Sequence, residues 1–62
     1  MEKLQEVIEK IENSELDSQT KQNTIEHLKE WYNEKKSIAW LEEKIEEVWE
    51  KILPILNEAG LI

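Results

Sequence analysis

The only histidine of the chain lies at a spacing from a glutamate that could support metal binding. On a helix, His27 and Glu30 would lie three residues apart on one face, as in metal sites that draw their remaining ligands from neighbouring helices. The sequence has no second histidine and no cysteine to complete such a site. We therefore interpret the pair as part of a solvated polar face and predict that the protein binds no metal.

A second candidate group is an acidic ridge in the C-terminal third, made of Glu42, Glu43, Glu46, Glu47 and Glu50. Carboxylates catalyse acid–base reactions where a cleft shifts their pKa, and an exposed helix face offers no cleft. We therefore predict no catalytic residue, no cofactor and no enzymatic activity. The ridge is either a solvated face or a mimic of nucleic-acid phosphates, because glutamates one helical turn apart lie about 5–6 Å from each other.

Three tryptophans in 62 residues form the third candidate group, because aromatic side chains are frequent anchors of protein interfaces. Trp31 and Trp49 lie on or beside apolar stripes and are most simply core residues. Trp40 lies off the stripe of its own helix, so it either covers the junction with the preceding helix or is exposed. The candidate contact residues are Trp40, Trp49, Leu53 and Tyr32.

Composition restricts the partners further. The net charge of −7 repels phosphate backbones and anionic lipid headgroups, so we expect no direct contact with nucleic acid or a membrane. No apolar run approaches the roughly 18 residues of a membrane-spanning helix. The absence of cysteine excludes a disulfide-stapled protein and fits a cytoplasmic location. A chain this short buries only about 60% of its surface, which favours a protein partner or self-association.

Apolar residues at helical spacing predict the elements that must position these groups. Residues 2–13 are predicted to form a first helix, and a second is predicted to begin at Asp17 or Ser18. The apolar stripe then shifts its phase by about a third of a turn, which predicts a chain reversal between Asn33 and Ser37 with Ser37 as the next N-cap. A single long arm in a two-helix hairpin is the alternative.

A heptad stripe marks the third predicted helix. It consists of Ile38, Leu41, Ile45, Val48, Ile52, Ile55 and Ala59. Pro54 interrupts the backbone hydrogen bonding and predicts a kink. Gly60 is predicted to end the helix in a left-handed conformation, with Leu61 against Leu56.

The sequence thus predicts an all-α protein, a small three-helix bundle in a single domain of residues 1–62, with the third helix longest and kinked near Pro54. We expect part of the apolar surface near Trp40, Trp49 and Leu53 to stay exposed in the monomer. The leading functional hypothesis is an acidic protein–protein interaction module, with a homodimer through the third helix as one form. The alternatives are an acidic inhibitor that mimics nucleic acid, and a natural or designed scaffold without a ligand.

Overall fold

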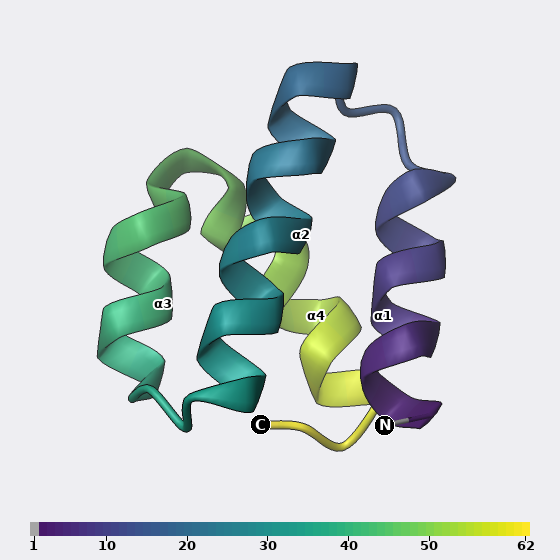
Figure 1. Cartoon of the computed structure of the whole chain (residues 1–62). Helices are drawn as coiled ribbons and strands as arrows, with labels where there is room; N and C mark the ends of the chain where they lie inside the picture. Colours follow the sequence, from purple (N-terminus) through teal and green to yellow (C-terminus); the bar gives the residue numbers. More distant parts are fainter. Residues whose placement is uncertain (1) are drawn as a thin grey trace.

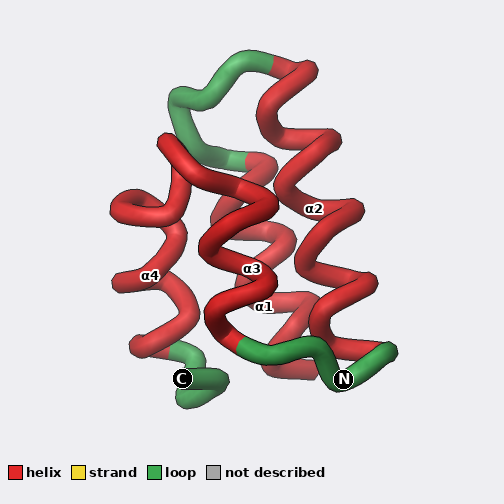
Figure 2. Tube along the Cα trace, turned by 90° about the vertical axis from the view of Figure 1, so that its left-hand side faces the viewer, coloured by secondary structure: helices red, strands yellow, loops and turns green. Residues whose placement is uncertain are grey.

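A computed structural model describes residues 2–62 and shows only helices, turns and loops in this range, so Met1 lies outside the described residues. The elements are α1 (Glu2–Glu12), α2 (Ser18–Asn33), α3 (Ile38–Ile45), the 3₁₀ turn η1 (Glu46–Val48) and α4 (Trp49–Glu58). The first three helices stand beside one another in chain order and alternate in direction, while α4 lies behind α1 and α2 (Figure 1). Seen from the side, α4 and α2 occupy opposite edges of the bundle (Figure 2). The predicted all-α bundle of three helical regions is confirmed.

Side-chain caps begin α2 and α3 at the predicted residues. The Asp17 carboxylate accepts a hydrogen bond from the backbone N–H of Thr20 at 3.3 Å and another from its hydroxyl. The Ser37 hydroxyl accepts the backbone N–H of Trp40 at 3.1 Å. Such caps satisfy N–H groups that have no partner within the helix. The reversal between Asn33 and Ser37 is therefore confirmed, and the single long arm is wrong.

The end of α4 also follows the prediction. Gly60 has a φ of 76°, which is the left-handed region that glycine adopts without a Cβ penalty. Its N–H donates to the carbonyl of Asn57 at 3.1 Å, and the Leu61 N–H donates to that of Leu56 at 3.0 Å. This pair of hydrogen bonds is the Schellman motif, in which the two leucines also supply the accompanying apolar contact.

Buried apolar side chains from all four helices form one core. The helix α1 contributes one face of its short length, and each other helix contributes two buried apolar residues. The core residues are Leu4, Val7, Ile8, Ile11, Leu28, Trp31, Leu41, Ile45, Ile52 and Leu56. Burial of each such side chain contributes about 2 kcal/mol, so this cluster is the main source of stability.

The prediction that the third helix is one long helix, and the longest, is wrong. The longest helix is α2, with 16 residues, and the third region breaks at Glu46. The kink near Pro54 stays a prediction. Glu46 has φ 35° and ψ −101°, which ends α3, whereas Pro54 lies inside α4. No glycine, proline or capping residue marks this break in the sequence. Packing of α4 beside α1 overrides the local preference for a continuous helix.

The break also divides the heptad stripe. Leu41, Ile45 and Ile52 are buried as expected, but Ile38 is 45% exposed. In α4 the fully buried partner of Ile52 is Leu56, whereas Ile55 on the predicted stripe is half-buried. The stripe therefore changes phase at η1, because α3 and α4 do not share one continuous helix axis.

Candidate interaction surface

One flank of α4 carries the two predicted contact residues that lie on a common face. Ile52 and Leu56 point into the core, and Trp49 and Leu53, which are one turn apart, lie next to them and are half-buried. The ring of Trp49 packs partly against the core. Further round the helix, Glu50 and Asn57 are exposed, so the half-buried pair borders solvent on that side.

Trp40 covers the junction with α2. This is one of the two alternatives that the sequence left open, the other being an exposed ring. Trp40 is half-buried and packs against the core from α3. Its ring meets that of His27 in α2 edge-to-face, with centroids 6.2 Å apart and an angle of 81°. The ammonium groups of Lys36 and Lys44 each lie 5.7 Å from the ring centre, at cation–π distance. The Trp40 ring is therefore engaged within the chain.

Tyr32 lies on α2 beside Trp31, with ring centroids 6.4 Å apart, and is half-buried. The four predicted contact residues come from three helices. Trp49 and Leu53 share a flank of α4, while Trp40 and Tyr32 belong to α3 and α2. A contact surface that includes all four stays a prediction.

The acidic ridge also crosses the break. All five glutamates are exposed, but Glu42 and Glu43 lie on α3, Glu46 and Glu47 in η1, and Glu50 on α4. The regular one-turn spacing that would match phosphates holds only along a continuous helix. The positive φ of Glu46 therefore bends the ridge at its centre.

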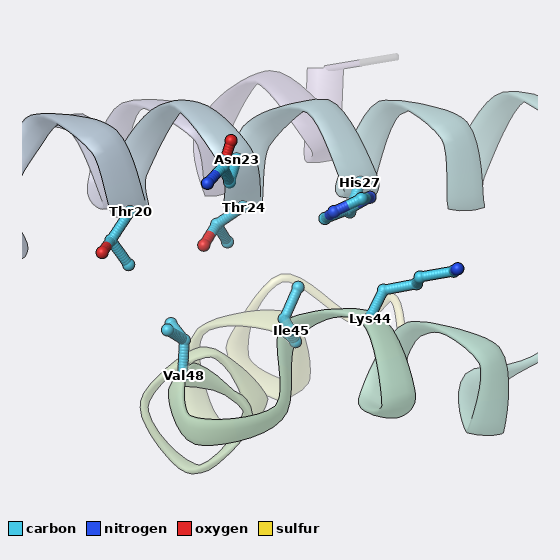
Figure 3. Close-up of a pocket in the computed structure, with 7 residues that line it drawn as sticks. All are labelled: Thr20, Asn23, Thr24, His27, Lys44, Ile45 and Val48. Carbon is cyan, nitrogen blue, oxygen red and sulfur yellow. The ribbon is translucent and has the colours of Figure 1, made fainter.

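A cavity of about 180 Å³ lies between α2 and the end of α3, and sequence analysis did not anticipate it. It is lined by Thr20, Asn23, Thr24, His27, Lys44, Ile45 and Val48. The close-up shows the two threonines and the imidazole facing the segment of Ile45 and Val48, whereas Lys44 extends away along α3 (Figure 3). The lining offers hydroxyl, amide, imidazole and ammonium groups but no carboxylate and no thiol. The Thr20 hydroxyl donates to Asp17 and the His27 Nδ1 has no hydrogen-bond partner, so this geometry does not pair a hydroxyl nucleophile with that base atom.

His27 has an incompletely satisfied ring in this cavity wall. Its Nδ1 lies 3.4 Å from Glu30 Oε1, but the geometry is not that of a hydrogen bond, and the atom is shielded from solvent. Among residues 2–62, no three histidine, cysteine, aspartate or glutamate side chains gather at metal-binding distances. Of the pair predicted to lie on a solvated face, Glu30 is exposed, but His27 is half-buried, with its imidazole against the ring of Trp40.

The fold and surface define the class as a small all-α bundle with a half-buried apolar flank. Comparison with protein-family models, with curated proteins and with solved structures found no match to this chain. Within residues 2–62, no helix combines the length and apolar character needed to cross a bilayer.

Proposed function

We propose that this chain is a small acidic protein–protein interaction module without enzymatic activity. The observation that supports it is the flank of α4, where Trp49 and Leu53 remain half-buried beside a core that other side chains already close. Tryptophan and leucine in this position supply apolar area that a partner can desolvate. A partially exposed tryptophan is a frequent energetic anchor of an interface.

The charges around this flank suggest the chemistry of the partner. Glu50 borders Leu53, and the chain as a whole has a net charge of −7. Interfaces place an apolar centre within a rim of complementary charge, which speeds association and selects the partner. The proposed partner is therefore a protein with an apolar patch surrounded by lysine or arginine side chains.

We also propose that the protein has no enzymatic activity and that it is located in the cytoplasm. The cavity between α2 and α3 holds hydroxyls and one imidazole, but the Thr20 hydroxyl donates to Asp17 and the His27 Nδ1 has no hydrogen-bond partner, which supports a non-enzymatic role. The lack of cysteine supports a reducing compartment such as the cytoplasm.

The proposal is tested by quantitative affinity capture from source cells with the immobilised chain and two matched variants. Leu53→Gln removes apolar area from the α4 flank, and Lys51→Gln changes an exposed residue on the opposite side of α4. We expect a protein retained by the original chain and by Lys51→Gln to be lost with Leu53→Gln. Circular dichroism of each variant checks that the fold is kept. Equal retention by all three chains would contradict the proposed surface.

The two alternative functions give different results in the same experiment. An acidic mimic of nucleic acid would retain nucleic-acid-binding proteins in a salt-sensitive manner, and Glu47→Lys would abolish this retention while Leu53→Gln would not. A scaffold without a ligand would retain nothing beyond the background of an unrelated acidic protein.

A further inference from the structure

The connection between α3 and α4 contains the most strained backbone of the described chain. Glu46 has φ 35° and ψ −101°, a combination that residues with a Cβ rarely adopt. No side chain caps the start of η1 or the start of α4. The turn therefore depends on the packing of the helices that it joins.

The residues of this turn favour a continuous helix. Glu46, Glu47 and Val48 include neither glycine nor proline, and glutamate is a good helix former. The apolar spacing also continues from Ile45 through Val48 to Ile52 without an offset. Straightening of the turn would give one helix from Ile38 to Glu58, roughly 30 Å long.

A straight helix would remove α4 from its place beside α1. In the compact chain, Glu58 on α4 forms an ion pair with Lys10 on α1 at 3.5 Å, and Ile52 and Leu56 are buried. These groups would become exposed in a straightened monomer. A surface that matches them in shape and charge is the vacated core of a second copy of the same chain.

We infer that the protein exchanges α4 between two copies, with Glu46 as the hinge. The exchange releases the strained φ in both chains and restores each contact between α1 and α4 across the pair. Short strained hinges promote this kind of domain swapping. The partner in this interaction is a second copy of the chain. The apolar contacts between the two copies are the core contacts that α4 makes within the compact monomer.

This exchange goes beyond the proposed function and does not depend on it. The α4 flank with Trp49 and Leu53 is half-buried in the compact chain, and exchange preserves the packing of α4 on an α1 helix. Loss of a partner in the Leu53→Gln variant therefore leaves the exchange unaffected.

The first test measures dimerisation by sedimentation equilibrium from micromolar to millimolar chain, after refolding at high concentration. Glu46→Gly relieves the strain of both compact chains and weakens both straight helices, so the dissociation constant should rise on the order of 1,000-fold. Glu46→Ala favours the straight helix and should lower it about fourfold. The control Glu47→Gly changes helix propensity alone and should raise it by only about tenfold. Monomers at every concentration for the original chain and for Glu46→Ala would overturn the inference.

The second test identifies which chain supplies α4. Because the sequence has no cysteine, Lys10→Cys in one chain and Glu58→Cys in another introduce the only thiols. The two chains, distinguished by a mass tag, are refolded together and treated with a short bismaleimide. A cross-linked pair joining residues 10 and 58 is the expected product.

The control is one chain that carries both cysteines, in which the compact monomer gives an internal cross-link. An internal cross-link there, with no product between the mixed chains, would overturn the inference. A dimer that forms without this cross-link would also overturn it, because the two copies would then associate through another surface.

Discussion

Two turns of this molecule place a residue with a side chain at positive φ, and they are built differently. Lys35, between α2 and α3, has a φ of 55°, and Glu46, between α3 and α4, has a φ of 35°. The first turn is closed by a 3.0 Å hydrogen bond from the Lys36 N–H to the Trp31 carbonyl and by the Ser37 cap. At the second, backbone hydrogen bonds run from the Glu46 N–H to the Glu42 carbonyl and from the Trp49 N–H to the Glu46 carbonyl, and no side chain caps the turn.

Local interactions stabilise one of these turns and tertiary packing stabilises the other, although both contain a residue at positive φ. The φ of Lys35 lies close to the value of about 57° found in the left-handed region, which single residues visit at modest cost. The ψ of −101° takes Glu46 out of that region. The turn at Lys35 is therefore supported by its own sequence, and the turn at Glu46 by the packing of α4.

The largest effect should come from Glu46→Gly. Glycine adopts the required backbone conformation without a Cβ clash, so the free energy of unfolding of the compact monomer should rise by about 1.5 kcal/mol. Urea denaturation at low chain concentration measures this change. A fall in the free energy of unfolding would show instead that residue 46 is helical, since glycine weakens a helix interior.

Removal of the Ser37 cap should have an effect of the opposite sign. Ser37→Ala leaves the N–H of Trp40 without its acceptor and should lower the free energy of unfolding by about 1 kcal/mol. Ser18→Ala is the matched control, because Asp17 caps that helix in its place. Equal losses in the two variants would mean that the Ser37 hydroxyl has no special role in the first turn.

Gly60→Ala provides a reference for a left-handed residue that sequence analysis identified. A Cβ at this position would have Lys3 Nζ as its nearest neighbour at 3.4 Å, which is ordinary contact with a flexible side chain. The loss of stability, about 1 kcal/mol, should therefore report the backbone strain alone. Thermal unfolding followed by circular dichroism gives the value, and an unchanged midpoint would contradict the assigned φ.

Lys35→Gly should stabilise the protein less than Glu46→Gly. The native φ at Lys35 is already near an allowed minimum, so relief of strain exceeds the entropy cost of glycine by only about 0.5 kcal/mol. Urea denaturation of both variants under the same conditions tests the order. A larger gain at position 35 than at position 46 would reverse the comparison of the two turns.

The smallest effect concerns acid. Hydrogen bonds from the Thr20 hydroxyl and then from its backbone N–H lower the pKa of Asp17. A carboxylate with a lowered folded-state pKa stabilises the protein above its unfolded-state pKa, and the contribution disappears as the pH falls through the folded-state pKa. The stability difference between the original chain and Asp17→Asn should shrink below about pH 4. A difference that is constant with pH would exclude this role.

Local chemistry explains which parts of the fold were predictable. Three residues have types that favour one particular position at a helix end, and each occupies that position. They are the N-caps Asp17 and Ser37 and the left-handed Gly60. The phase shift between Leu28 and Leu41 identified the first turn because two stripes cannot share one straight helix. The break at Glu46 has no such signal, since both the residue types and the apolar spacing continue through it.

The candidate surface was predictable only in part for the same reason. Trp49 and Leu53 share a flank because they lie one turn apart in one helix, which the sequence contains. The contact between Trp40 and His27 and the cavity beside it depend on how α3 meets α2 in space. Spacing within one helix does not determine a contact between two helices.

The packing of α4 beside α1 also governs the order in which the chain folds. It joins the first helix to the last, so its closure orders nearly the whole chain, whereas α1–α2 and α2–α3 are hairpins of neighbours (Figure 1). The entropy of loop closure grows with the length enclosed, and contacts distant in sequence slow folding. We expect the two hairpins to assemble first and α4 to dock in the rate-limiting step. Amide hydrogens of α4 should then be the first to exchange with solvent in the native state.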